Sequence, residues 1–438
     1  MVCRSPVVRS LRLRWSLAPN MYRSAARWFR PTQFQPASAK SRDHDYEVAI
    51  ENFPIGRGAT LRELEEDPHP LLARLRTAEP VSWLAVRGGW LVTRYDLATR
   101  VMRDPTTFTV DDPRFSTSRV VGVSMLSLDG ADQTRHREPF AHPFRPARVQ
   151  DRFAGFVEAE ADRLISAIRP AGSAELRCEF AGPLAVAVVS EALGLRDISV
   201  DTVLSWYAAI VAAVSEVTAG RPVTAAGADA FARLRTAVTR TLGSTNEPSL
   251  LSEATQAPEG LSQDEVASNA AVLMFGGIDT TEGMILNAVR HLLGNPGALP
   301  LVRDHADLLP NAIEESIRLE PAVAIVDRYA TRDVELGGGR IQRGDLVSVS
   351  IAGANRDPAM FSEPDRFDIR RANARLNLAF AQGPHFCLGA QLARTETTIA
   401  VGRLLDRLPE LRLDPDYPHA PQGLVFRKPP TLQVRWTV

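Results

Sequence analysis

The chain has 438 residues and an almost neutral formal charge of −1, from 51 basic and 52 acidic side chains. This length allows either about three average domains or one large core. The balanced charge argues against a nucleic-acid partner, which needs a basic surface, and against an acidic disordered chain. The cysteines Cys3, Cys178 and Cys387 are too few and too scattered for a disulfide framework, so we expect a reducing compartment and a buried structural thiol at Cys178. No stretch approaches the roughly 18 consecutive apolar residues of a membrane-spanning helix, so we expect no transmembrane segment.

The first 45 residues differ in composition from the rest. Arginines recur through them with interleaved aromatic residues, and no acidic residue precedes Asp43. This pattern is typical of an organelle transit peptide or a membrane-surface segment, but an upstream start codon, with Met21 as a later alternative, would produce it equally. A secretory signal peptide is not indicated, because its apolar core is missing. We expect residues 1–45 to be a disordered extension and residues 46–438 to form one large domain.

The globular part begins with short elements. Residues 61–75 have the spacing of a helix, and residues 81–86 and 90–93 read as two strands joined by a glycine turn. Residues 105–128 lack a clear period, so we expect a long loop lined by apolar side chains, and loops of this length are often functional. Residues 129–137 then start an Arg-rich helix whose face would simply be solvated. Residues 151–245 are mostly amphipathic helix with no visible chemistry.

A long helix is predicted over residues 262–294. Ser262 and Glu265 form a capping box at its start, and Gly294 followed by Pro296 ends it. Its middle is apolar nearly all round and therefore buried. Residues 276–281, Gly-Gly-Ile-Asp-Thr-Thr, interrupt it with two glycines, each of which costs about 1 kcal/mol against Ala in a helix. The glycines serve either close helix packing or a functional site.

Two further segments carry polar residues at regular spacing. Glu315 and Arg318 lie three residues apart on one helix face, which alone predicts a surface ion pair worth a few tenths of a kcal/mol. The apolar residues 322–326 lead to Arg328, and the three glycines at 337–339 indicate a hairpin turn.

The last signal is Cys387, which lies in the glycine-rich segment 380–389 just before a helical pattern. A lone cysteine usually packs as a small hydrophobe. Here the turn at Gly383 and Pro384 favours a ligand, because amide groups and the helix dipole at a helix start would favour a thiolate. Zinc is not expected, since about four Cys or His ligands are needed and only His385 lies near. A single thiolate fits haem iron better.

This segment resembles the haem-binding loop of the cytochrome P-450 superfamily, Phe-Gly-x-Gly-x-His/Arg-x-Cys-x-Gly. Five pattern positions match, and Ala381 stands where the family usually has Gly. Residues 276–281 are similar to the oxygen-activation motif Ala/Gly-Gly-x-Asp/Glu-Thr-Thr/Ser. The resemblance extends over about residues 46–438 and depends on the order of five motifs. The matching positions of the loop are Phe380, Gly383, His385, Cys387 and Gly389.

The resemblance implies a role for each matching residue. Cys387 would ligate the iron, with Phe380 and His385 also in the cofactor site. Gly276 would leave room for dioxygen, while Asp279 and Thr280 would act in oxygen activation and proton delivery. The haem propionates would be bound by Gln133, Arg137 and Arg328, since a guanidinium fork suits a carboxylate. A structural network would join Glu315, Arg318 and Arg366, and the substrate would contact Val323, Ala324 and Ile325.

The implied fold is mainly α with a small β region, in which one long central helix crosses over haem b. The implied activity is that of a bacterial monooxygenase, which hydroxylates or epoxidises a hydrophobic small molecule with dioxygen. Because no flavin or iron–sulfur domain is visible, electrons would come from a ferredoxin and its reductase or another separate reductase. We expect a cytoplasmic monomer. A peroxide-driven haem enzyme and a haem- or ligand-binding protein without turnover are the alternatives.

Overall fold

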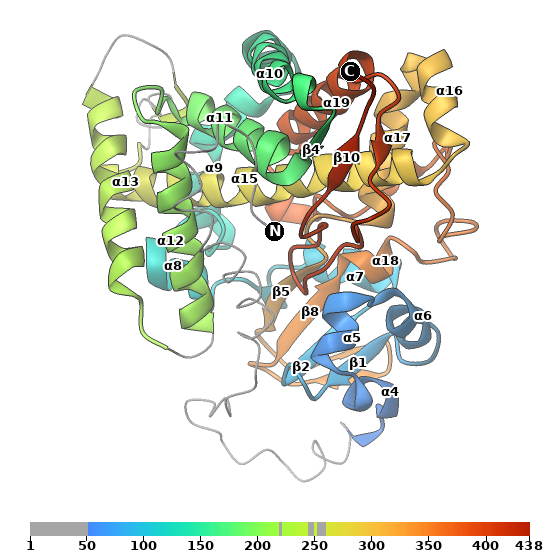
Figure 1. Ribbon diagram of the computed structural model, residues 1–438. Helices are drawn as coiled ribbons and strands as arrows, with labels where there is room; N and C mark the ends of the chain where they lie inside the picture. The colour runs from blue at the N-terminus through green and yellow to red at the C-terminus, as the bar shows by residue number, and fades with distance from the viewer. Residues whose placement is uncertain (1–50, 219–220, 244–248, 252–259) are drawn as a thin grey trace.

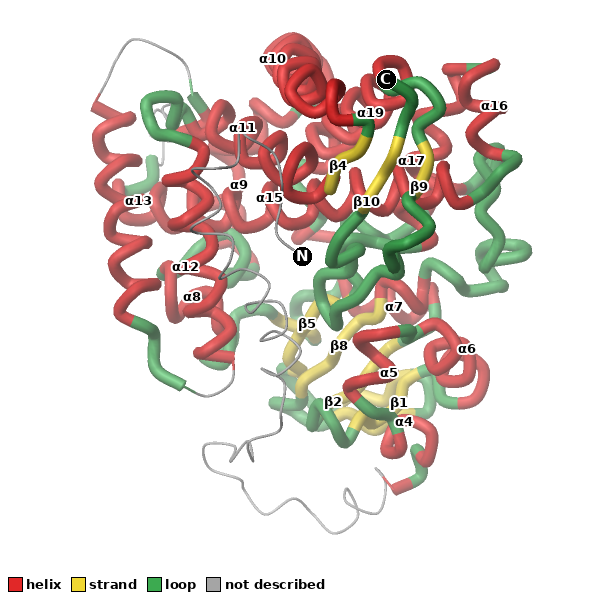
Figure 2. Tube along the Cα trace, viewed as in Figure 1, coloured by secondary structure: helices red, strands yellow, loops and turns green. Residues whose placement is uncertain are grey.

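The computed structural model describes residues 51–218, 221–243, 249–251 and 260–438, so the boundary expected at residues 45 and 46 lies outside the described residues. A small β-rich region lies below a larger helical region in Figure 1, and the long helix α15 (Gln263–Gly294) crosses the middle. Helices dominate the tube view, and strands are confined to the lower region and a short sheet near the C-terminus (Figure 2). The predicted fold class, mainly α with a small β region, is confirmed.

The main sheet has five strands in the order β1-β2-β8-β5-β3. β1 and β2 form the predicted antiparallel hairpin, in which Leu84 pairs with Gly89. β2 is parallel to β8, and the remaining neighbours are antiparallel. Strand side chains such as Val81, Trp90 and Val347 form an apolar cluster of their own below the helices. The strands are β1 (Val81–Leu84), β2 (Gly89–Val92), β3 (Phe108–Thr109), β5 (Ile325–Ala330) and β8 (Leu346–Ser350).

Two smaller sheets complete the β structure. The predicted turn at residues 337–339 joins β6 to β7, and Gly337 and Gly338 both have positive φ angles, of 50° and 87°, which glycine adopts without strain. The other sheet joins β4 to the C-terminal strand β10. Its strands and those of the hairpin are β4 (Ser173–Glu175), β9 (Arg412–Leu413), β10 (Gln433–Arg435), β6 (Val334–Leu336) and β7 (Gly339–Ile341).

Two expectations for the N-terminal part are wrong. Residues 61–75 do not form one helix but fall in two, α5 (Leu61–Glu66) and α6 (His69–Ala78), because Pro68 cannot continue the first and is suited to begin the second. Residues 105–128 are not one loop, since they contain β3 and the helix α8 (Ser116–Val121). β3 and α8 both bury apolar side chains, which the sequence shows only as scattered apolar residues. The six residues of α8 are too few for a helical period to be recognised.

The helix α15 begins and ends where the sequence predicts. Ser262 accepts a hydrogen bond from the Glu265 amide and Glu265 returns one, so the capping box is present. The 32 residues of α15 extend for about 48 Å at 1.5 Å per residue. α15 packs against α11, α13 and α19 around the main apolar cluster. It therefore provides the wall on which distant segments can converge.

The remaining helices surround α15 or cover the sheet. Those beside the sheet are α4 (Pro54–Gly58), α7 (Tyr95–Arg103) and α18 (Ile351–Ala354). Those of the helical region are α9 (Gly130–Ala141), α10 (Pro146–Ile168), α11 (Gly182–Leu193), α12 (Val200–Thr218), α13 (Ala225–Gly243), α16 (Ala298–Asp304), α17 (Leu309–Leu319) and α19 (Ala390–Arg407). The single-turn helices are η2 (His142–Phe144), η3 (Arg169–Ala171), η5 (Ala306–Leu308), η6 (Ala374–Leu376) and η7 (Gly383–His385), and η4 (Arg177–Ala181) is a π-helix.

Within the described ranges, α12 is the one helix long and apolar enough to cross a membrane. The buried side chains of α12 include Val203 and Ile210, whereas Leu204, Ala208 and Val211 line an internal cavity. The helix thus has an apolar environment on two faces within the protein, which accounts for its composition.

Candidate active site

The loop that carries Cys387 is held by its own backbone. The Cys387 amide donates to the Phe380 carbonyl at 2.8 Å, and α19 begins three residues later at Ala390. The position just before a helix start is therefore as predicted. The Arg394 guanidinium lies over the Phe380 ring, 4.3 Å from its centroid, and fixes the first residue of the loop.

Two residues of this loop have left-handed backbone conformations. Gly383 has a φ of 71°, and a Cβ there would lie 2.6 Å from the Met102 carbonyl oxygen, so only glycine fits. Ala381 has a φ of 57°, which costs a residue with a side chain roughly 1–2 kcal/mol. The departure from the family pattern at Ala381 therefore leaves the turn intact at the cost of local strain.

The loop faces a cavity of about 2850 Å³ in the middle of the molecule. The Cys387 side chain is accessible from this cavity although it is enclosed by the protein. Burial raises the pKa of the Cys387 thiol, whereas the Gly389 amide and the guanidinium of Arg137 lower it less. The loop amides alone thus do not bring the pKa of the thiol below its usual value, whereas a coordinated metal ion would favour the thiolate strongly.

Arg137 and Arg328 enter the cavity wall from opposite regions of the chain. Arg137, on α9, donates to the Phe386 carbonyl, and Arg328, on β5, donates from Nη1 to the Asp327 carbonyl at 2.8 Å. Burial lowers the pKa of both guanidinium groups. Neither makes an ion pair within the described part of the chain. Two half-buried or buried cations that lack a carboxylate partner would be stabilised by an anionic ligand in the cavity.

Gln133 and His385 differ from each other in what they contact. His385 lines the cavity, and its Nε2 lies 2.8 Å from Oδ1 of Asp129. Gln133, expected at a propionate, is instead buried outside the cavity wall and donates to the Pro384 carbonyl at 3.0 Å. The propionate contact expected of Gln133 stays a prediction; in the structure its amide donates to the main chain of the cysteine loop and stabilises that loop.

The central helix contributes residues 276–281 to the same cavity. Gly276, Asp279 and Thr280 all line it, and the Thr280 hydroxyl donates to the Gly276 carbonyl one turn earlier. Asp279 forms an ion pair with Lys428, a residue of the C-terminal segment. A carboxylate and a hydroxyl are thus adjacent on α15 in the cavity that Cys387 faces, an arrangement that can relay protons.

Comparisons with known proteins decide the family. The Cytochrome P450 family model matches residues 239–435. Cytochrome P450 107B1 of Saccharopolyspora erythraea is 35% identical over 366 residues, which is 80% of this chain and 89% of the relative. The chain is a cytochrome P450. The cytochrome P450 monooxygenase PikC of Streptomyces venezuelae is 34% identical over 400 residues, 86% of this chain and 93% of PikC.

The fold agrees with this family. The crystal structure of CalO2 matches with a TM-score of 0.78 and 31% identity, over 85% of this chain and 96% of CalO2. The protein is therefore a P450 oxidoreductase, a haem-thiolate oxygenase that acts on small molecules. The predicted resemblance to bacterial P450 enzymes is confirmed.

The residues that line the cavity of this P450 are suited to bind haem. The Cys387 thiol is accessible from the cavity, and the same space is lined by two guanidinium groups that form no ion pair with any described residue, as the carboxylates of a porphyrin would require. No heavy atom lies within 4 Å of the Cβ position of Gly276, and the nearest to that of Gly389 is 3.9 Å away. A flat cofactor can therefore approach both backbones.

The two adjacent glycines of residues 276–281 have different structural roles. A Cβ at Gly276 would meet nothing within 4 Å, whereas one at Gly277 would lie 2.5 Å from Cγ2 of Val189 on α11. Both alternatives raised by the sequence are thus present in one motif. Gly277 permits close helix packing, and Gly276 keeps the cavity open.

Replacing each glycine with Ala is therefore expected to have opposite effects on stability. Gly276→Ala should raise the free energy of unfolding by up to about 1 kcal/mol through helix propensity, while its methyl group occupies cavity space. Gly277→Ala should lower it by about 1–3 kcal/mol, because Val189 is stiff and must move. Urea denaturation of both variants measures this difference, and equal effects would contradict the assignment.

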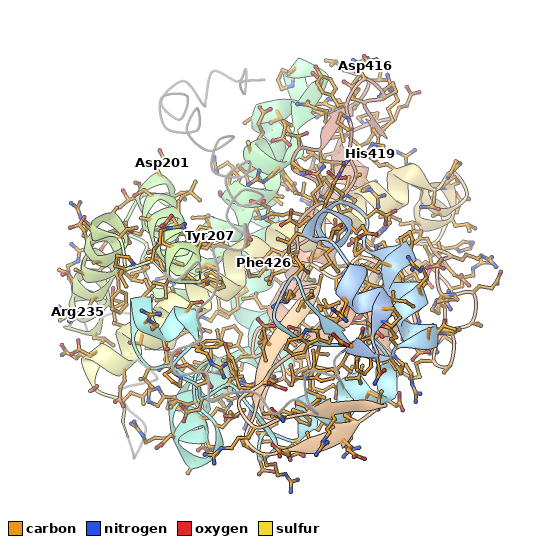
Figure 3. The ribbon with its side chains drawn as sticks, turned by 90° about the horizontal axis from the view of Figure 1, so that it is seen from below. Asp201, Tyr207, Arg235, Asp416, His419 and Phe426 are labelled. Carbon is orange, nitrogen blue, oxygen red and sulfur yellow. The ribbon has the colours of Figure 1, made fainter. Side chains whose placement is uncertain are left out.

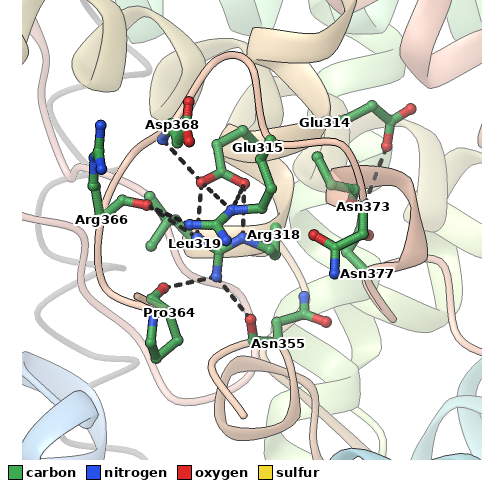
Figure 4. Close-up of polar contacts among 12 residues, drawn as sticks. Glu314, Glu315, Arg318, Leu319, Asn355, Pro364, Arg366, Asp368, Asn373 and Asn377 are labelled. Carbon is green, nitrogen blue, oxygen red and sulfur yellow. Dashed lines mark hydrogen bonds and ion pairs between the residues drawn. The ribbon is translucent and has the colours of Figure 1, made fainter. Parts of the chain in front are cut away.

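The expected network behind the loop contains a different arginine. Arg318 binds Glu315 through Nε and Nη2, at 2.7 and 2.8 Å (Figure 4). The third cation is Arg371, whose Nε lies 2.9 Å from Oε1 of Glu315. Arg366 was the expected third member, and this is wrong: its guanidinium is 62% exposed and pairs with Glu363, and only its carbonyl joins the network.

The three substrate-contact candidates lie in an extended segment, and only two of them line the cavity. Val323 and Ile325 line the cavity, as expected. Ala324 does not; it is buried, and its amide donates to the Val425 carbonyl. The expectation for Ala324 is corrected, because successive side chains of an extended chain point to opposite faces.

Several residues of the site are absent from the sequence prediction. They are Arg371, Asp129, Lys428, Arg177 and Tyr207, all of which reach the site from segments distant in sequence. The one available signal is that Lys428 is one of two lysines in a chain whose other basic residues are arginines.

Proposed function

We propose that this P450 hydroxylates or epoxidises a hydrophobic small molecule, using dioxygen and electrons from a separate redox partner. The observation that carries this proposal is a single cavity that Cys387 faces and that apolar side chains of α12, α15 and the segment before Arg328 line. Its volume of about 2850 Å³ exceeds the roughly 300–1,000 Å³ of an ordinary ligand pocket, which leaves room for cofactor and substrate together.

Haem b is the cofactor we propose. Cys387 would be its thiolate ligand, Arg137 and Arg328 would bind its carboxylates, and His385 and Phe380 would flank it. When bound, a thiolate-ligated haem supplies the electron-rich iron that favours cleavage of the O–O bond. The chain's own residues exclude water, orient the substrate and move protons, with Asp279 and Thr280 as the proposed proton path.

The remaining expectations complete the proposal. Residues 46–438 would be the catalytic domain and residues 1–45 an extension that catalysis does not need. The enzyme would be a cytoplasmic monomer that receives electrons from a ferredoxin and its reductase. Arg145 is exposed and available to an acidic partner, whereas Arg394, the other docking candidate, already binds Glu314.

The test combines a spectrum with turnover. The purified protein, reduced and exposed to carbon monoxide, is expected to have the strongly red-shifted Soret band of a thiolate-ligated haem. Product should form with NADPH, ferredoxin and ferredoxin reductase. Turnover with peroxide alone would favour a peroxide-driven enzyme, and the band without any turnover would favour a binding protein. A screen for compounds that shift the Soret band by displacing iron-bound water would identify the substrate class.

A further inference from the structure

Four charged side chains form a buried cluster at one end of the oxygen-activation motif. Lys428 Nζ lies 2.7 Å from Oε1 of Glu282 and also pairs with Asp279. Arg177 donates from Nε to the same Glu282 oxygen at 2.8 Å. The four side chains are only 5–12% exposed, and two acids balance two bases.

The cluster is built so that its two acids depend on Lys428 to different degrees. Glu282 has a second buried cation, Arg177, which the Pro430 carbonyl also holds at 3.1 Å. Asp279 has Lys428 as its direct ion-pair partner among the described residues. Loss of the ammonium group would leave Glu282 its ion pair with Arg177, whereas the buried Asp279 carboxylate would lose the cation that contributes most to its ionisation.

A second polar contact reaches Asp279 from α12. The Tyr207 hydroxyl lies close enough to the Asp279 carboxylate to lower the pKa of that group. The Tyr207 ring lies 6.4 Å from that of Phe275, which in turn lies 5.6 Å from Phe426 near Lys428 in the chain. Tyr207 and Phe426 both lie near the middle of the molecule in Figure 3. Asp279 is thus the point where α12, α15 and the C-terminal segment meet.

We infer that Lys428, supported by Tyr207, is the positioning residue that holds Asp279 ionised and fixed in direction beside Thr280, so that the C-terminal segment controls proton supply to the active site. This inference rests on the proposed monooxygenase function. It assigns to two residues outside every recognised motif a part in the reaction. Their action is through Asp279, since neither needs to touch the cofactor.

The charges around Asp279 determine whether its pKa rises or falls when Lys428 is replaced. Burial favours the neutral acid, but Lys428, then Arg177 and the Tyr207 hydroxyl, favour the carboxylate, and the pKa of Asp279 is lowered on balance. Glu282 on the same helix acts against them. Asp279 is therefore ionised at neutral pH in the native protein. Removing the Lys428 charge leaves burial unopposed by its main partner, so the pKa of Asp279 should rise and its titration should move to higher pH.

The experiment measures the proton on Asp279 directly and during turnover. In Lys428→Met holoenzyme, the infrared spectrum should gain the band of a buried protonated carboxyl group. This band should disappear as the pH rises through the raised pKa and should be missing in the double variant with Asp279→Asn. Product formed per electron pair should fall about tenfold, less than the roughly 100-fold cost of losing an acid–base group. The amount of product per electron pair, plotted against pH, should gain an inflection at the pH where the infrared band titrates.

Three further variants separate positioning from general support. Lys428→Arg keeps the charge, so its yield of product per electron pair should show no inflection with pH, as in the native enzyme. Tyr207→Phe keeps the ring contacts and should give a smaller shift in the same direction, which tests the inference even where Lys428→Met fails to fold. Arg435→Met, in the same C-terminal segment but paired with Asp414, should retain the native profile.

The outcomes distinguish this inference from the proposed function. A flat profile and no carboxyl band in Lys428→Met or Tyr207→Phe would overturn the inference, as would the same inflection in Arg435→Met. In both cases the red-shifted band of the carbon monoxide complex would persist. Absence of that band in the native protein would instead refute the haem-thiolate function itself.

Discussion

Replacing Cys387 with Ser or His is expected to abolish the strongly red-shifted Soret band of the reduced carbon monoxide complex. That band requires a thiolate ligand, which neither a hydroxyl nor an imidazole reproduces. The loop itself should persist, because the contact to Phe380 uses the Cys387 backbone amide and not its side chain. The absorption spectrum of the reduced variants under carbon monoxide measures the effect, and monooxygenase turnover should be lost with the band.

Cys178 provides the matched control. This free cysteine is half-buried and lines the same cavity, whereas we expected a buried structural thiol. Cys178→Ser should leave the band unchanged, since Cys178 lies within the π-helix η4, where its amide donates to Glu175 at 2.8 Å, and not in the loop before α19. Survival of the band in Cys387→Ser, or its loss in Cys178→Ser alone, would show that Cys387 is not the ligand.

Those parts of the fold that depend on neighbours in sequence were predictable. The Ser262 capping box, the β1–β2 hairpin and the β6–β7 turn each depend on a few adjacent residues, and each lies where the sequence places it. The same holds for the position of Cys387 just before α19. Such signals are local because a cap or a turn is determined by backbone conformations within a few residues.

The errors arise where a contact joins distant segments. Arg366 and Arg371 are arginines only five positions apart, and the path of the chain between them decides which guanidinium reaches Glu315. Lys428 meets Asp279 across 149 positions, so no local pattern connects them. Gln133 matches a motif position, and the contact that no local pattern predicts is the one from its amide to the Pro384 carbonyl, 251 positions along the chain. A motif therefore predicts which residues gather at the site better than it predicts their partners.

Replacing Arg371 with Met is expected to destabilise the network behind the cysteine loop strongly. Glu315 and Arg318 are fully buried, so Glu315 would keep one cation where it now has two. The Ser362 carbonyl would also lose the hydrogen bond that Arg371 donates at 2.7 Å. Breaking a buried ion pair costs about 3–5 kcal/mol when it leaves a charge uncompensated; because Glu315 keeps Arg318, we expect a loss of about 3 kcal/mol in the free energy of unfolding from urea denaturation.

Arg366→Met is the control that makes this measurement decisive. It removes the same charge a few residues away, but the Arg366 guanidinium is exposed and binds the exposed Glu363. Its contribution to the network is a backbone carbonyl, which accepts hydrogen bonds from Arg318 and Arg371 and survives the substitution. The change in unfolding free energy should therefore stay within about 0.5 kcal/mol. Equal losses in the two variants would mean that the third cation of the network is not Arg371, and a larger loss in Arg366→Met would restore the motif-based assignment.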